Sequence, residues 1–156
     1  MSRKRSTVFP GRYELIGQIC DFVLAGASEA GFDPDDTFQV NLACDEACTN
    51  IIEHAYNGED NGEIFVSWEI RDDNFIITLH DNGEPFDPAT VPKPMIPADP
   101  AQISQLQVGG LGLHLMRKVM DDVHFRFDDN GNVVIMTKRL PPRPPAAPTP
   151  QEQEET

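Results

Sequence analysis

The spacing of the apolar residues changes once along this chain, and the change limits the folds that it can adopt. Over residues 12–30 and 34–57, apolar side chains recur every three or four positions, which is the spacing of one helix face. From Ile64 to Ile70 the period becomes two, and Phe75 to His80 forms a returning run of the same kind. We therefore expect two helices followed by a pair of antiparallel strands.

The remaining segments complete a predicted α+β fold. A short edge strand is expected at residues 7–9, a third helix at 113–121, and two strands at 123–127 and 133–140, joined by Asp129-Asn130-Gly131, a strong hairpin signal. This order of elements predicts a two-layer sandwich, in which a mixed, mainly antiparallel sheet is covered on one face by helices.

The start of the second helix is marked by Asp33-Pro34, which suits an N-cap followed by a first-turn proline. We expect its apolar positions to face the core, namely Phe38, Leu42, Ala47, Ile51 and Ala55. The domain organisation follows from these elements and from composition. Residues 1–8 form a basic leader with the edge strand, 9–140 form one domain, and 141–156 form a disordered, proline-rich acidic tail.

Charge and composition exclude several classes of function. A formal net charge of -14 argues against nonspecific binding of nucleic acid, which requires lysine and arginine. No apolar run approaches the roughly 20 residues of a membrane helix, and the basic start lacks the apolar stretch of a secretory signal. We expect a cytoplasmic protein. Cys20, Cys44 and Cys48 are expected to be reduced core thiols, with a metal shared by Cys44 and Cys48 as the less favoured alternative.

The segment from Asp45 to Ala55 carries the first candidate site residues. Glu46 and Asn50 are four residues apart, so both side chains leave the same face of the helix. A carboxylate can move a proton, and an amide oxygen can hold a hard divalent cation. Taken alone, the pattern is better explained by an ordinary amphipathic helix with two outward polar positions.

Two further segments are candidates for ligand contacts. Asp81-Asn82-Gly83 lies where a buried strand ends, where a carboxylate could accept a hydrogen bond from an exocyclic amine and glycine would let a flat ring approach the backbone. After a long, proline-rich loop, Gly109-Gly110-Leu111-Gly112 precedes an apolar helix. Its backbone amides and the helix N-terminus could hold phosphate oxygens. A simple turn and a flexible hinge are the structural alternatives.

The order of these segments resembles that of the GHKL ATPases, the group of gyrase, histidine kinases and mismatch-repair ATPases. Within this group the chain is most similar to the bacterial anti-sigma-factor serine kinases, from about Phe9 to Leu140. The resemblance implies a Bergerat-type ATP-binding fold, with ATP and Mg²⁺ as cofactors and the proline-rich loop as a lid. It also implies a homodimer, an anti-anti-sigma (STAS-type) protein as substrate and a sigma factor as sequestered client.

The resemblance also assigns roles to individual residues. Glu46 matches the general base, Asn50 the magnesium ligand, and Asp81 the carboxylate that recognises the adenine amino group. The remaining matches contact the nucleotide: Gly83 beside the adenine ring, Gly109, Gly110, Leu111, Gly112 and Leu113 around the phosphates, and Thr137 in support of the adenine pocket.

Three features depart from the family pattern or lie beside it. Pro85 stands where the wider superfamily has a second glycine, which places the flexibility of that loop in question. Lys93 is the only cation between Asp81 and Val108, so no basic residue for the transferring phosphoryl group can be named. His54 follows Asn50 by one turn, and we expect it to pack in the structure rather than act in the pocket.

The sequence thus predicts transfer of the ATP γ-phosphoryl group to a serine or threonine of a partner protein. Phosphoryl transfer depends mainly on positioning and charge neutralisation, which the three segments could supply together. Three alternatives remain open at this stage. They are a non-catalytic, nucleotide-dependent binding module, a detached histidine-kinase catalytic domain, and simple ATP hydrolysis.

Overall fold

The computed structural model describes residues 3–90 and 108–142. Its elements, in chain order, are β1 (Arg3–Pro10), η1 (Tyr13–Leu15), α1 (Ile16–Ala30), α2 (Pro34–Asn50), η2 (Ile51–Ala55), β2 (Glu63–Arg71), β3 (Asn74–Asp81), η3 (Pro88–Thr90), α3 (Val108–Val119), β4 (Asp122–Asp128) and β5 (Gly131–Arg139). The η1 and η3 segments are 3₁₀ turns, and η2 is a single π-helical turn that continues α2.

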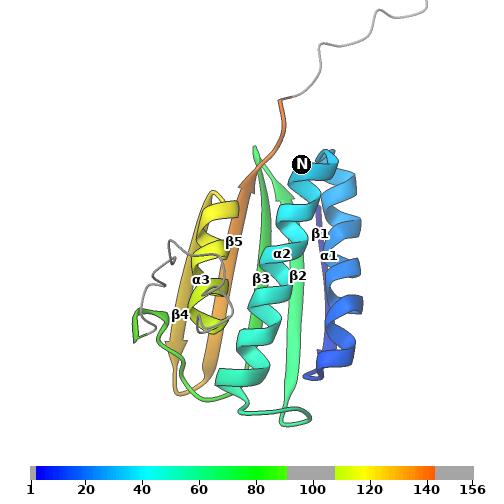
Figure 1. Ribbon diagram of the computed structural model, residues 1–156. Helices are drawn as coiled ribbons and strands as arrows, with labels where there is room; N and C mark the ends of the chain where they lie inside the picture. The colour runs from blue at the N-terminus through cyan, green and yellow to red at the C-terminus, as the bar shows by residue number, and fades with distance from the viewer. Residues whose placement is uncertain (1–2, 91–107, 143–156) are drawn as a thin grey trace, which may run out of the picture.

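The strands form one sheet in the order β1-β2-β3-β5-β4, and α1, α2 and α3 cover one of its faces (Figure 1). The predicted α+β sandwich is confirmed. All four strand pairings are antiparallel, so the sheet of the described residues is not mixed. Strand β5 lies between β3 and β4. Because it pairs with β3 in antiparallel orientation, the end of β3 meets the start of β5, and Asp81 lies opposite Asn132. This placement sets up the site described below.

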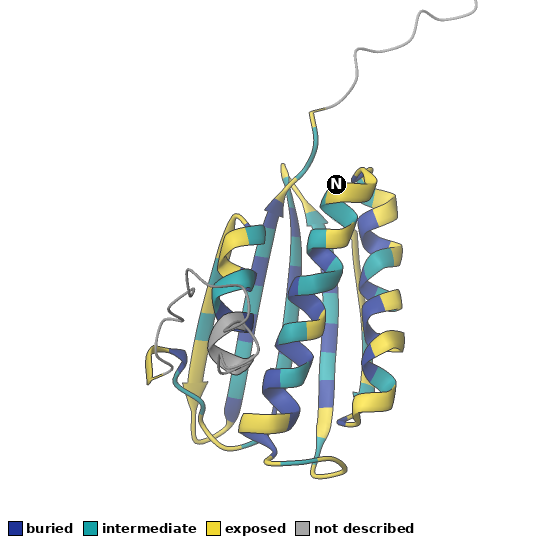
Figure 2. Ribbon diagram, viewed as in Figure 1, coloured by how far each residue is buried: buried dark blue, intermediate teal, exposed yellow. Residues whose placement is uncertain are grey.

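The core lies between the helices and the inner face of the sheet (Figure 2). Phe75 of β3 is the largest fully buried side chain, in edge-to-face contact with Phe32 and stacked with Trp68. The three cysteines are buried and free, as expected of core thiols. Within residues 3–90 and 108–142, no helix combines the length and apolarity that crossing a membrane requires.

Element boundaries differ from expectation mainly where tertiary contacts extend or shorten an element. Strand β1 covers Arg3–Pro10 rather than residues 7–9, because its whole length pairs with β2. The first helix begins at Ile16 instead of residue 12, and the third begins at Val108 instead of Leu113. The prediction for Phe38 was wrong. Its side chain is 65% exposed on the outer face of α2, because the apolar stripe of this helix is narrower than its spacing suggested.

The start of α2 follows its sequence signal. Oδ1 of Asp33 accepts a hydrogen bond from the backbone N–H of Asp36 at 2.8 Å, and Pro34 occupies the first turn. This cap satisfies one of the backbone donors that a helix N-terminus leaves free. The N-cap prediction is confirmed. The proposed boundaries of the leader, domain and tail stay predictions, and the tail from residue 143 lies outside the described residues.

Gly26 marks the closest contact between α1 and the sheet. A Cβ atom at this position would lie 2.4 Å from the indole ring of Trp68, which is buried. We expect Gly26→Ala to lower the free energy of unfolding by about 1–3 kcal/mol through overpacking. Gly17 is the matched control on the same helix, since nothing lies within 4 Å of its added Cβ.

We expect Gly17→Ala to raise the free energy of unfolding by about 0.5–1 kcal/mol, because alanine favours the helix. Denaturant unfolding of both variants, followed by circular dichroism, measures the two effects. Equal changes in the two variants would contradict the close contact at Trp68.

Candidate nucleotide site

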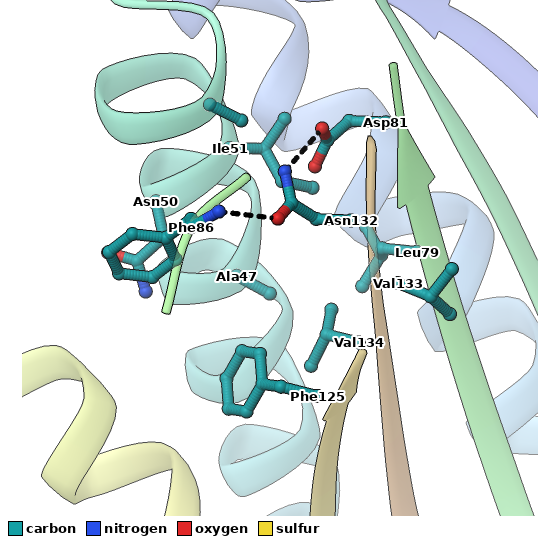
Figure 3. Close-up of a pocket in the computed structure, with 11 residues that line it drawn as sticks. Ala47, Asn50, Ile51, Leu79, Asp81, Phe86, Phe125, Asn132, Val133 and Val134 are labelled. Carbon is teal, nitrogen blue, oxygen red and sulfur yellow. Dashed lines mark hydrogen bonds between the residues drawn. The ribbon is translucent and has the colours of Figure 1, made fainter. Parts of the chain in front are cut away.

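A pocket opens between the end of α2 and the strands β3, β5 and β4 (Figure 3). Most of its walls are apolar, and three polar side chains reach it, from Asn50, Asp81 and Asn132. The apolar lining consists of Ala47, Ile51, Ala55, Leu79, Phe86, Phe125, Val133 and Val134. An apolar cavity with a few convergent polar groups is the usual form of a small-molecule site.

Asp81 ends β3 and is only 1% exposed. Its Oδ1 accepts hydrogen bonds from the backbone N–H of Gly83 and from Nδ2 of Asn132, both at 2.9 Å. Burial raises the pKa of the Asp81 carboxyl, and these two hydrogen bonds oppose the rise by favouring the charged form. Among the described residues no hydrogen bond reaches Oδ2. That oxygen remains an acceptor for a donor group in the pocket.

Asn132 was not predicted from the sequence, yet it connects three parts of the site. Besides Asp81, its Nδ2 donates to the carbonyl of Glu84 at 2.8 Å, and its Oδ1 accepts from the backbone N–H of Phe86 at 2.7 Å (Figure 3). Asn132 therefore fixes both the Asp81 carboxylate and the segment that brings the Phe86 ring to the pocket wall. No sequence signal identifies it, because its partners are at least 46 residues away in the chain.

Gly83 makes a close approach, although to the protein's own backbone. A Cβ at Gly83 would lie 2.4 Å from the carbonyl oxygen of Ala55, and the neighbouring Glu84 N–H donates to that oxygen at 2.9 Å. The π-helical turn η2 presents this carbonyl; such turns often occur at functional sites. Gly83 lies outside the lining of this pocket, and its place beside a bound ring stays a prediction.

Asn50 is buried at the end of α2 and lines the pocket. Its Nδ2 lies 3.9 Å from the sulfur of Met116 on α3, in a weak hydrogen bond. This contact turns the donor end of the amide toward α3 and leaves Oδ1 as its ligand atom. A neutral amide oxygen is a ligand type that Mg²⁺ accepts. The structure places Asn50 at the pocket, and its role as a magnesium ligand stays a prediction.

Glu46 lies one helical turn before Asn50 and contacts α3 directly. A Cβ on Gly112 would lie 2.0 Å from Oε2 of Glu46, so only glycine fits against the carboxylate in this arrangement. Glu46 is half-buried, and burial is the main cause that raises the pKa of its carboxyl, followed by the charges of Asp45 and Glu53. The two predicted segments, the acidic helix and the glycine run, thus meet in space.

The glycine run itself is helical. Gly109, Gly110 and Leu111 lie in the first turn of α3, where a loop was expected, and only their backbone is described. Leu113 is 4% exposed and packs in the core. Glycine has a weak helix propensity, which favours a loop at these positions. The packing of α3 against α2 overrides this propensity here.

Two other candidates are absent from the pocket lining. Thr137 pairs with Ile76 near the opposite end of β3, and it is absent from the pocket lining. Its predicted support of a ligand pocket does not agree with this position. His54 is exposed rather than buried, and its ring stacks on Phe86 at 4.9 Å between centroids. Packing against the pocket wall is therefore its visible role. Lys93 and most of the proposed lid lie outside the described residues.

The arrangement can recognise a flat, mostly apolar ring that carries a hydrogen-bond donor. The ring faces would contact the apolar walls, and the donor would meet Oδ2 of Asp81. Two further groups lie on α2 next to this pocket. The amide oxygen of Asn50 suits a cation, and the carboxylate of Glu46 suits the acceptance of a proton. These are the components that nucleotide binding and phosphoryl transfer require.

Comparisons with known proteins agree with this geometry. The profile of the histidine kinase-like ATPase domain matches residues 9–138. The serine-protein kinase RsbW of Bacillus licheniformis is 40% identical over 134 residues, which cover 84% of this chain and 82% of the relative. RsbW of Listeria monocytogenes is 39% identical over 115 residues and 73% of each chain.

Solved structures share the fold at lower sequence identity. The crystal structure of the RsbU and RsbW domains of a Mycobacterium tuberculosis protein matches with a TM-score of 0.63 at 16% identity, over 88% of this chain and 32% of that one. The catalytic domain of histidine kinase ThkA matches with a TM-score of 0.52 at 18% identity, over 87% of this chain and 96% of that one. These likenesses concern the fold alone.

Proposed function

This chain belongs to the histidine kinase-like ATPase family, and from that premise we propose that it is a serine-protein kinase that transfers the γ-phosphoryl group of ATP to a partner protein. The observation that carries the proposal is that Asn50 and Asp81 line one pocket, while Glu46 lies one helical turn before Asn50 and against Gly112, in a chain 40% identical to RsbW. The family assignment supplies ATP binding. The roles of the individual residues are our proposal.

Asp81 would recognise adenine. Its free Oδ2 would accept a hydrogen bond from the exocyclic amine, while Asn132 and Gly83 hold Oδ1 in place. The apolar walls would contact the two faces of the ring. Hydrogen bonds to a charged acceptor are worth about 1.5–3 kcal/mol, enough to make this contact decisive for affinity.

Asn50 fits the requirements of a magnesium ligand. Mg²⁺ typically takes one or two protein oxygens and completes its octahedral shell with phosphates and water. Oδ1 of Asn50 is the free oxygen, because Nδ2 is engaged with Met116. When bound, the ion would neutralise phosphate charge, which is needed in a chain of net charge -14.

Glu46 would accept the proton of the attacking hydroxyl. Burial raises the pKa of its carboxyl, and a more basic carboxylate is a better proton acceptor as long as it stays ionised. The hydroxyl would enter between α2 and α3, where Glu46 lies against Gly112. We propose that it belongs to a serine of an anti-anti-sigma-type protein, that a sigma factor is the sequestered client, and that the kinase acts as a homodimer.

A phosphotransfer assay tests this function. The purified protein is mixed with γ-labelled ATP, Mg²⁺ and a partner that co-purifies with it, and the labelled product is treated with acid. We expect label on the partner that survives acid, as serine phosphate does. Label lost in acid would indicate histidine phosphorylation, and release of free phosphate alone would indicate hydrolysis. Either result would overturn the proposal.

Gly112→Ala is expected to lower the transfer rate by about 10²-fold, because the added Cβ displaces the Glu46 carboxylate by an ångström or more. Stability should not fall, because the atoms nearest that Cβ all belong to the flexible side chain of Glu46, and alanine favours helix α3. Transfer kinetics and denaturant unfolding of the same preparation separate these effects. An equal loss of stability and activity would contradict the assignment.

A further inference from the structure

The helices α1 and α2 form a layer of one sign of charge. Together they carry six acidic residues and no lysine or arginine, namely Asp21, Glu29, Asp35, Asp36, Asp45 and Glu46. Two of these are paired with basic residues of the sheet: Glu29 lies 3.0 Å from Arg3, and Asp36 lies 3.8 Å from Lys138. Within the described residues, Asp21, Asp35 and Asp45 are exposed and have no ion-pair partner.

An apolar groove lies in the same layer. It runs between the end of α1 and the start of α2 and is lined by Leu24, Ser28, Phe32, Thr37, Phe38 and Asn41. Phe38 is the most exposed large hydrophobic side chain of the described residues, at 65%. Figure 2 shows the outer surfaces of both helices open to solvent. A single exposed phenylalanine is common on protein surfaces, but here Phe38 adjoins the apolar groove, and the two together form a candidate contact site.

The charges and the groove are arranged along one side of α2. Asp35, Phe38 and Asp45 follow each other at intervals of three and seven residues, so they lie on one helix face. Asp21 and Leu24 are placed in the same way on α1, three residues apart. The apolar groove is thus flanked by carboxylates on both helices. A ligand that fits it must offer an apolar side chain with cationic groups on either side.

We propose that this surface docks a basic amphipathic helix of a partner protein. An apolar residue of that helix would enter the groove beside Phe38, and its lysine or arginine residues would face Asp35, Asp45 and Asp21. A groove between two packed helices can accept a third helix. The apolar residues of that helix, spaced three or four positions apart, would enter the groove. The acidic layer would attract the partner over a distance, which raises the association rate at low salt.

The groove at Phe38 is separate from the nucleotide site, although the docking surface extends to Asp45, the neighbour of Glu46. Phe38 precedes Glu46 by eight residues, or about 12 Å along the helix axis. Substitutions at Phe38 should therefore leave ATP binding unchanged. Failure of the docking proposal would not affect the proposed kinase activity, and the reverse is also true.

Binding of a designed peptide tests the proposal. The probe is a fluorescein-labelled, 18-residue helix of leucine and lysine, with leucine on one face, and the control is a scrambled peptide of the same composition. Anisotropy titrations of the full chain should give at least 10-fold tighter binding for the amphipathic order. Phe38→Ser should lower that affinity about 10-fold. Phe127→Ser, which changes a 44% exposed phenylalanine on β4, should not.

Charge and self-association complete the test. Asp35→Asn with Asp45→Asn should weaken binding and reduce its salt dependence, because two facing anions are lost. Equal binding of the two peptides would show charge attraction alone and overturn the proposal. An unchanged affinity of Phe38→Ser would do the same. If Phe38→Ser instead converts a dimer to a monomer in sedimentation, a second copy of the chain covers the groove and the proposal is wrong.

Discussion

Replacing Glu46 with glutamine is expected to lower the rate of phosphoryl transfer by about 10²- to 10⁴-fold, the usual contribution of a positioned general base. Glutamine keeps the size of the side chain but cannot accept the hydroxyl proton. The affinity for ATP should change little, because Glu46 is not part of the pocket lining. Single-turnover transfer with saturating ATP measures the rate, and calorimetry measures the affinity.

The pH profile distinguishes a base from a residue with a structural role. In the wild type, transfer should fall as the pH drops through the pKa of Glu46, because the protonated carboxyl no longer accepts a proton. Burial, and then the charges of Asp45 and Glu53, raise this pKa, so the fall begins at a higher pH than for an exposed glutamate. The residual rate of Glu46→Gln should lack this fall.

Glu69→Gln is the matched control for Glu46→Gln. It removes one charge by the same isosteric change on β2, away from the helices. Its transfer rate should equal that of the wild type. A Glu46→Gln variant with the wild-type rate and pH profile would refute the role of Glu46 as the base.

Much of the fold could be predicted because the relevant signals are local. The change from helical to alternating period gave the main elements, and Asp33 fulfils its N-cap role through the Asp36 N–H. The hairpin at Asp129-Asn130-Gly131 formed where expected. Gly131 has a φ of 117°, and a Cβ there would lie 2.0 Å from the carbonyl oxygen of Asp81. The same glycine therefore makes the turn and lets it pack against the nucleotide site.

The register between distant strands could not be predicted, and it decides which residue supports Asp81. The pairing of β3 with β5 puts Asn132 opposite Asp81 and Thr137 opposite Ile76. Thr137 follows Asn132 by five positions, an odd number, so their side chains point to opposite faces of the sheet. A threonine on the correct strand was therefore identified at the wrong position.

The width of a helix's apolar face also depends on its neighbours. The spacing of α2 predicted the direction of its buried side, and Ala47, Ile51 and Ala55 are buried as expected. Phe38 lies at the margin of that side, and among the described residues its side chain stays 65% exposed. Sequence periodicity sets the centre of the stripe, whereas tertiary packing sets its edges.

Asp81→Asn is expected to weaken ATP binding by about 10- to 150-fold, which corresponds to the 1.5–3 kcal/mol of a hydrogen bond to a charged acceptor. Asparagine can keep Oδ1 as the acceptor for Gly83 and Asn132. Its Nδ2 then replaces the free Oδ2 and turns a donor toward the donor group of adenine. Calorimetric titration with a nonhydrolysable ATP analogue and Mg²⁺ measures the loss.

The same substitution should not destabilise the protein at pH 8, and this separates recognition from folding. Burial raises the folded-state pKa of Asp81 above the 3.8 of an ordinary aspartate, so folding is opposed by the ionised carboxylate at high pH. The stabilising effect of protonation is complete below the unfolded-state pKa and is lost as the pH rises through the folded-state pKa. Any stability advantage of Asp81→Asn is therefore largest at pH 8 and shrinks on acidification.

Thermal unfolding at pH 8 and pH 5, without nucleotide, measures this pH dependence. Asp122→Asn is the control, because Asp122 is an exposed residue at the start of β4 and opposite Thr137, far along β5 from Asn132. It should alter neither ATP affinity nor the pH dependence of stability. A stable Asp81→Asn variant that binds ATP as the wild type does would show that adenine is recognised elsewhere. In that case nucleotide recognition would not offset the free-energy cost of burying the Asp81 carboxylate.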